Sequence, residues 1–150
     1  MTLAILDTNV VVQSLISSPT SMSTRVLDAF HNGWFRLAYS SAVVEELLEV
    51  LCTPRIRIRH RLSDSGILAI VESLLVRSLE YRGRSVVPLS LARDLTDNKF
   101  LALALESRAE FLVTNDHRHL IPIGQFHETR IVTPPVFLQA INYSSKVDMP

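Results

Sequence analysis

Four short apolar runs set the strongest limit on how this chain can fold. They cover residues 3–6, 35–39, 111–114 and 130–133. None of them shows the polar alternation of a half-exposed strand, as expected where helices cover both faces of a parallel sheet. The runs therefore predict buried strands.

Helical patterns separate these runs. They span residues 24–30, 41–52, 65–80 and 97–107, with a short last one over 135–142. Polar, turn-rich loops are predicted at 17–21 and 121–128. Strands that alternate with helices favour an α/β protein, and we expect a three-layer α/β/α sandwich with a mostly parallel central sheet.

Composition is typical of one compact domain. The chain has 150 residues, of which 47% are hydrophobic and 20% are charged. We expect the domain to span residues 1–142 and residues 143–150 to form a flexible tail. Fifteen basic residues balance fifteen acidic ones, so net charge gives no indication of nucleic acid binding.

Cys52 is the single cysteine, so the chain has no intrachain disulfide and no zinc cage built from thiolates. The first residues lack the basic lead and long apolar stretch of a signal peptide. Charged residues interrupt every apolar stretch before it reaches membrane-spanning length. We therefore expect a soluble, cytoplasmic protein.

Acidic residues follow two of the predicted strands. Asp7 comes directly after the first run, and Asp116 follows the run 111–114. Ligands of an open parallel sheet collect at the carboxyl ends of its strands, so both carboxylates are expected at the same edge. Asp7 could instead cap the next helix, and Asp116 could belong to an ordinary turn.

Glu46 occupies an unusual place on the predicted helix 41–52. Glu45 and Glu49 share its polar face, whereas Glu46 borders the apolar face beside Val43 and Val50. Burial of a carboxylate is costly unless a cation or hydrogen-bond donors compensate it, which indicates a metal. A side chain that reaches out to water is the alternative.

Asp97 opens the helical pattern 97–107, one turn before Phe100 and Leu101 on the apolar side. It could also be an ordinary acid stabilised by the helix dipole. Asp94 is a second candidate for the same role.

Carboxylates that converge on one pocket repel one another, and proteins keep such clusters mainly to hold hard divalent cations. The four candidates are Asp7, Glu46, Asp97 and Asp116, with Thr8, Asn9 and Thr114 as supporting polar groups. Oxygen ligands favour Mg²⁺ or Mn²⁺, which can activate water and neutralise a phosphodiester. The cluster thus predicts hydrolysis of a nucleic acid backbone.

These residues stand in a series of short motifs. The motifs are Asp7-Thr8-Asn9-Val10, Glu46-Leu47, Asp97-Asn98-Lys99-Phe100-Leu101 followed by Ala104, and Val113-Thr114-Asn115-Asp116. In this order the chain, from Leu3 to about Ala140, resembles the PIN (PilT N-terminus) domain, and above all the VapC-like toxin components of bacterial toxin-antitoxin systems. The ending 131–138 is also similar to that group. Many members carry Gly where Asn115 stands.

The resemblance carries expectations about the site. By position, Asp7, Glu46 and Asp97 match the core acids of the family, and Asp116 matches a more variable fourth. The resemblance implies a Mg²⁺- or Mn²⁺-dependent endoribonuclease. It also implies that the protein forms a homodimer or higher homo-oligomer and is silenced by a cognate antitoxin.

A dense basic segment lies between residues 55 and 61. Its arginines are Arg55, Arg57, Arg59 and Arg61, and together with Lys99 they are candidate RNA contacts. The alternative is a solvated helix face whose arginines pair with acids. His117 and His119 are expected to be surface residues outside the site. The stretch 67–79 is apolar on more than one side, which fits either a core helix or a surface that contacts another chain.

Two other functions compete with the ribonuclease. One is a catalytically silent PIN-like module that acts by RNA or protein binding. The other is a haloacid-type phosphatase, whose first strand should end in two aspartates spaced by one residue. Asn9 stands at the second of those positions, which disfavours the phosphatase.

Overall fold

The computed structural model describes residues 1–83 and 98–144 of the chain. Their strands form one six-stranded sheet with the order β3-β2-β1-β4-β6-β5. The strands are β1 (Leu3–Leu6), β2 (Arg36–Ser40), β3 (Leu79–Tyr81), β4 (Phe111–Val113), β5 (Gln125–Phe126) and β6 (Thr129–Val132). Neighbouring strands run parallel except β5, which is antiparallel to β6. The predicted mostly parallel α/β fold is confirmed.

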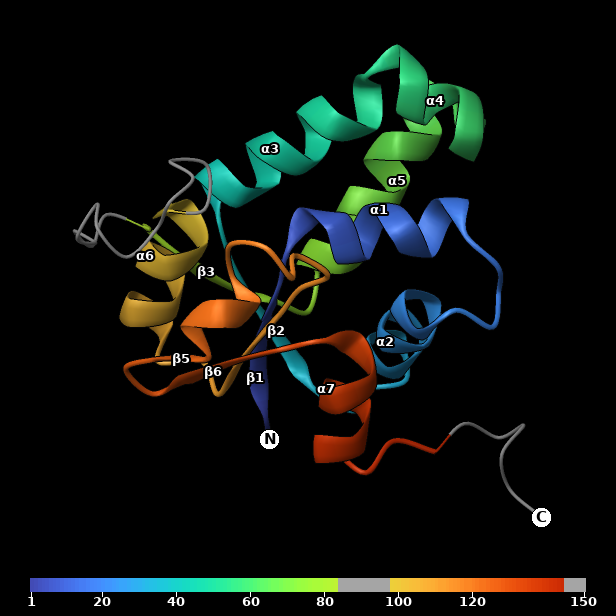
Figure 1. Ribbon diagram of the computed structural model, residues 1–150. Coiled ribbons are helices and arrows are strands. Elements are labelled where there is room, and N and C mark those ends of the chain that lie inside the picture. The colour runs from blue at the N-terminus through green and yellow to red at the C-terminus, as the bar shows by residue number, and fades with distance from the viewer. Residues whose placement is uncertain (84–97, 145–150) are drawn as a thin grey trace.

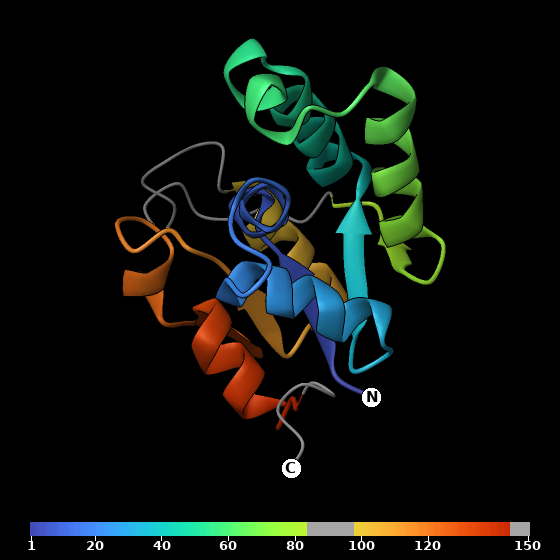
Figure 2. The ribbon, with the colours of Figure 1, turned by 90° about the vertical axis from the view of Figure 1, so that its right-hand side faces the viewer.

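Helices cover both faces of this sheet. They are α1 (Thr8–Ile16), α2 (Met22–His31), α3 (Ser41–Cys52), α4 (Pro54–His60), α5 (Asp64–Leu75), α6 (Asn98–Ser107) and α7 (Pro134–Ala140), with a 3-10 turn η2 at Ile121–Ile123. Helices α1, α2 and α7 lie on one side and α6 lies on the other (Figures 1 and 2). Within the described ranges, none of the helices combines the length and apolar character needed to span a bilayer.

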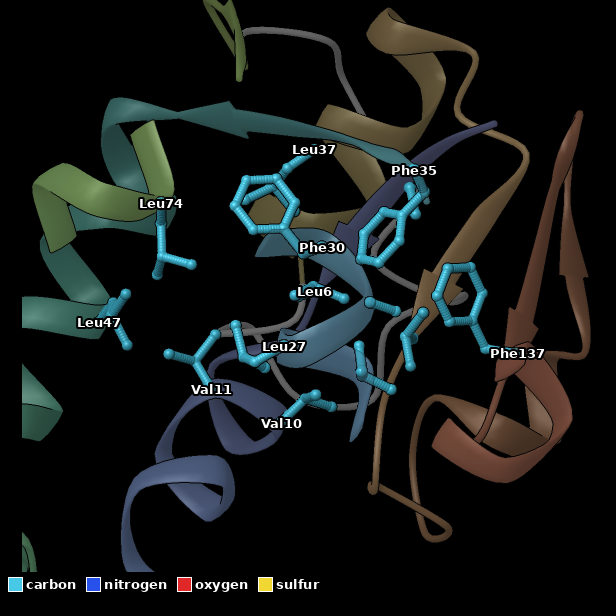
Figure 3. Close-up of a cluster of buried hydrophobic side chains, with 14 of the residues drawn as sticks. Leu6, Val10, Val11, Leu27, Phe30, Phe35, Leu37, Leu47, Leu74 and Phe137 are labelled. Carbon is cyan, nitrogen blue, oxygen red and sulfur yellow. The ribbon is translucent and has the colours of Figure 1, made fainter. Parts of the chain in front are cut away.

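The strands β1, β2, β4 and β6 lack regular polar alternation because their apolar residues pack into two cores, one on each face of the sheet. On β1, Ala4 and Leu6 pack into the core beneath α1, α2 and α7, whereas Ile5 packs against α6. Leu112 of β4 likewise points toward α6. Figure 3 shows part of the first core, in which the ring of Phe137 from α7 lies beside that of Phe35, with centroids 4.9 Å apart.

The structure differs from the sequence predictions mainly at short elements. The predicted helix 65–80 ends at Leu75, and residues 79–81 form the edge strand β3, which pairs with β2. A strand of three residues is too short to show a periodicity of its own. The predicted loop 121–128 contains η2 and the two-residue strand β5. Asp97, the predicted start of α6, lies outside the described residues.

The chain end also carries a packed residue. The ring of Tyr143 meets Trp34 edge-on at a centroid distance of 5.2 Å, and the guanidinium of Arg25 lies 5.9 Å from the same ring. Tyr143, which the sequence analysis placed at the start of the tail 143–150, therefore contacts Trp34 and Arg25. Residues 145–150 of the predicted tail lie outside the described residues.

Candidate active site

Asp7 lies at the carboxyl edge of the sheet, where β1 ends and α1 begins (Figure 1). Parallel pairing sets Leu6 opposite Val113, and the backbone N–H of Asp7 donates to the Val113 carbonyl at 2.9 Å. Asp7 is the N-cap residue of α1, yet its side chain makes no capping hydrogen bond. The capping alternative therefore does not explain this carboxylate.

The carboxylate of Asp7 is buried among donors. The Thr114 hydroxyl donates to Oδ2 at 2.7 Å, and the side-chain amide of Asn9 donates to the same atom at 3.1 Å. Only 6% of Asp7 is exposed. Hydrogen bonds to a charged acceptor offset part of the cost of burying it. Thr114 and Asn9, two of the polar groups that the sequence analysis expected beside the acids, thus both donate to the carboxylate of Asp7.

Thr114 connects Asp7 to Asp116. The backbone N–H of Asp116 donates to the Thr114 hydroxyl oxygen at 2.9 Å. A backbone N–H can only donate, so the hydroxyl accepts on that side and its own proton points to Asp7. One fully buried hydroxyl therefore fixes the loop after β4 against the acid after β1.

The side chain of Asp116 orders its own turn. Its Oδ1 accepts from the backbone N–H groups of Arg118 at 3.0 Å and His119 at 2.9 Å. Nδ1 of His119 lies 3.4 Å from Oδ2, so His119 contacts a candidate acid, contrary to the expectation from sequence. Local bonds of this kind are those of an ordinary Asp turn. Asp116 nevertheless lines the same pocket as Asp7.

Glu46 reaches the site from α3 and is held from two sides. The hydroxyl of Thr8, on α1, donates to Oε2, and the ammonium of Lys99, on α6, lies 3.0 Å from Oε1. Glu45 and Glu49 are exposed, while Glu46 is half-buried, as its place on the helix predicted. Glu46 thereby brings α1, α3 and α6 together at one point.

The contacts of Asn115 next to the site could not be read from the sequence. The backbone N–H of Asn115 donates to Oδ1 of Asn9 at 3.1 Å, and its side-chain amide donates to the hydroxyl of Ser23 at 3.2 Å. Ser23 is a buried residue of α2. The replacement of the family's frequent Gly by Asn115 was visible in sequence, but its partner on α2 was not.

These groups surround one open pocket of about 300 Å³. Its lining residues are Asp7, Thr8, Asn9, Val12, Gln13, Glu46, Val50, Phe100 and Asp116. Three of the four predicted acids therefore line one pocket, although they come from distant segments of the chain. Asp97 and the second candidate Asp94 lie outside the described residues.

The donor set fits a hard cation. Asp7, Glu46 and Asp116 offer carboxylate oxygens from three separate elements to one pocket, and oxygen ligands suit Mg²⁺ or Mn²⁺. Within residues 1–83 and 98–144, no three His, Cys, Asp or Glu side chains are close enough together to form a metal site. Lys99 instead supplies a positive charge to Glu46. Because Mg²⁺ keeps several waters and is bound by one or two protein carboxylates, Asp7 and Glu46 are the described residues that would hold a divalent ion, and Asp116 lines the same pocket.

The basic segment forms α4, which directly follows α3. Arg57 forms an ion pair with Asp64 at 2.7 Å. For this arginine the structure therefore shows a pair with an acid, which was the alternative to RNA contact. Arg55, Arg59 and Arg61 are exposed. Contact of these arginines with RNA remains a prediction.

Solved structures share this fold. A chain of the VapBC2 complex from Rickettsia felis, bound to a DNA fragment from their promoter, aligns with a TM-score of 0.54 and 15% identity, covering 87% of this chain and 98% of that one. A chain of FitAB bound to an IR36 DNA fragment aligns with a TM-score of 0.52 and 17% identity, covering 87% of this chain and 94% of that one. At such low identities the likeness shows the fold alone. No curated protein matches the sequence.

The sequence itself matches the profile of the PIN domain over residues 4–118. That stretch begins in β1, contains α1 to α3, and ends two residues after Asp116. It includes the acids that meet at the carboxyl edge of the sheet. The chain therefore belongs to the PIN domain family.

Proposed function

We propose that this chain is a divalent-metal-dependent endoribonuclease. The observation that carries the proposal is that Asp7, Glu46 and Asp116 line the same pocket of a PIN domain. PIN domain nucleases generally use divalent metals, and these acids are the oxygen ligands that such metals require. Asp97, one residue before α6, is proposed as the fourth acid.

The residues of the chain have distinct roles in this proposal. Asp7 and Glu46 hold the cation, with Thr114 and Asn9 fixing the orientation of Asp7. The bound cation would make water more acidic and neutralise charge on the phosphodiester. Val12, Val50 and Phe100 give the same pocket an apolar surface beside the acids. Lys99 and the arginines of α4 are proposed RNA contacts.

Cleavage of single-stranded RNA by the purified protein tests this proposal. We expect cleavage with Mn²⁺ or Mg²⁺ and none with a chelator. Asp7→Asn and Glu46→Gln should each lower the rate by about 100-fold or more, because even outer-shell partners of a metal site contribute about 10- to 100-fold. A DNA strand of the same sequence is the control for the substrate, and we expect the protein to leave it uncleaved.

Glu45→Gln and Glu49→Gln are matched controls for Glu46→Gln. They remove the same charge from exposed positions of the same helix and should leave the rate unchanged. A folded wild-type protein that binds RNA but does not cleave it in either metal would favour the catalytically silent binding module instead.

We further propose that the chain is the toxin of a type II toxin-antitoxin system. The fold is shared with chains of VapBC2 and FitAB, which supports a partner protein that neutralises the activity. Induced expression in a bacterial host should arrest growth, and Asp7→Asn should relieve the arrest. Co-expression with the product of the adjacent reading frame should restore growth and yield a stable complex.

The growth experiment and the cleavage assay test the toxin role and the nuclease activity separately. Normal growth in the presence of the active enzyme, with no protein captured from the adjacent frame, would contradict the toxin role. The nuclease proposal would stand in that case, and an RNA-processing role would replace the toxin.

We also propose assembly into a homodimer or higher homo-oligomer. Ile58 on α4, Leu68 on α5 and Val76 directly after α5 are exposed apolar residues. Large exposed apolar side chains on these two consecutive helices favour contact with another chain.

A further inference from the structure

Lys99 and Glu46 form an ion pair inside the pocket. Nζ lies 3.0 Å from Oε1, and the two side chains are only 24% and 18% exposed. The other carboxylate oxygen, Oε2, accepts from Thr8. Among the described contacts, each oxygen of this proposed metal ligand is therefore bound by a group of the protein.

The two contacts differ in what a metal ion would do to them. The Thr8 hydroxyl is neutral, and its bond to Oε2 can persist beside a cation. The Lys99 ammonium carries a full positive charge on Oε1, and a divalent ion on the same carboxylate would repel it strongly. Oε1 is thus the oxygen at which a metal and the protein compete.

Repulsion between the carboxylates explains why a positive charge beside Glu46 stabilises the metal-free pocket. Asp7, Glu46 and Asp116 all line the pocket, and carboxylates that face one pocket without a positive charge raise one another's energy. Lys99 reduces this repulsion and holds Glu46 in place. Thr8 on α1 and Lys99 on α6 together fix the carboxylate between two helices.

We propose that Lys99 is a positioning residue that pairs with Glu46 in the metal-free protein and is displaced from Oε1 by the incoming divalent cation. The inference rests on the proposed metal site. Displacement leaves the ammonium beside the pocket that receives the phosphodiester, where a compact positive charge can contact phosphate.

Calorimetric titration of Mn²⁺ into the metal-free protein tests the competition. Lys99→Met keeps the aliphatic stem and removes the charge. We expect Mn²⁺ to bind this variant about tenfold more tightly, because even at a water-like dielectric constant a nearby unit charge opposes a dication by that amount. A Lys99 that served only to hold Glu46 in place would give weaker binding in the variant.

Two variants serve as controls. Lys99→Arg keeps the charge and should bind Mn²⁺ with an affinity close to that of the wild type. Arg36→Met removes a charge from the amino end of β2, opposite the edge that carries the acids, and should also leave the affinity unchanged. If Lys99→Met does not fold, Lys99→Gln takes its place.

The possible results are distinguishable. Unchanged or weaker Mn²⁺ binding by the folded variant, with normal binding by the wild type, overturns the role of Lys99 and leaves the metal site intact. No Mn²⁺ binding by the wild type overturns both the metal site and the competition. In the metal-free state the variant should also melt at a lower temperature than Lys99→Arg.

Discussion

At the scale of single residues, the Thr114 hydroxyl is the clearest link between the acids. It donates to Asp7 and accepts from the backbone of Asp116, so two elements of the site depend on one oxygen. Removal of this hydroxyl leaves the part-buried N–H of Asp116 without its acceptor and the buried carboxylate of Asp7 with one donor fewer. Both losses cost free energy.

Thr114→Val should therefore weaken the site while keeping the shape of the side chain. We expect the free energy of unfolding to fall by about 1–3 kcal/mol and metal-dependent cleavage to fall by about 10- to 100-fold. Urea unfolding and initial cleavage rates measure the two effects. Thr114→Ser keeps the hydroxyl and should retain most of the activity.

Thr129→Val is the matched control for this substitution. Thr129 is also fully buried, and its hydroxyl donates to the Ala109 carbonyl at 2.6 Å. It begins β6, at the edge of the sheet opposite the acids. The control should lose stability by a similar amount and keep its cleavage rate, whereas equal loss of activity in both variants would show that Thr114 acts only through stability.

At the scale of elements, periodicity predicted the helices and strands that present the acids. The bounds of α3 were predicted as residues 41–52, and β1 as residues 3–6, because both have strong patterns and clear ends. Apolar runs without alternation predicted a parallel sheet, and a parallel sheet predicted that Asp7 and Asp116 lie at the same edge. Both residues line the same pocket in the structure. The half-buried position of Glu46 followed from the 100° step of the helix.

Contacts between elements could not be predicted in this way. A helical period shows which side of α3 or α6 faces inward, but not which residues of the two helices meet. The pair of Lys99 and Glu46 and the bond from Asn115 to Ser23 both depend on that packing. The strand β3 was missed for a similar reason, since its three residues are defined by pairing with β2.

At the scale of the whole molecule, the helices α3, α4 and α5 extend beyond the sheet on the side of the carboxyl ends (Figure 1). Ile67, Val71 and Leu74 bury the inner side of α5 in the first core. The outer side keeps Leu68 exposed by 53%, and Ile58 on α4 and Val76 directly after α5 are exposed by 75% and 80%. The apolar character of the stretch 67–79 thus exceeds what the core of one chain buries.

A second copy of the chain is the partner that we propose for this surface. Leu68→Glu should raise the dissociation constant of the homodimer by at least about tenfold, because burial of one leucine contributes about 1.5–3 kcal/mol and a buried unpaired charge opposes association further. Light scattering across a concentration series measures the change. Val136→Glu makes the same kind of substitution at an exposed position of α7 and should leave the dimer intact.

Leu68 is exposed in the single chain, so the melting temperature of dilute Leu68→Glu protein should equal that of the wild type. A wild type that remains monomeric at high concentration would contradict self-association through the outer side of α5.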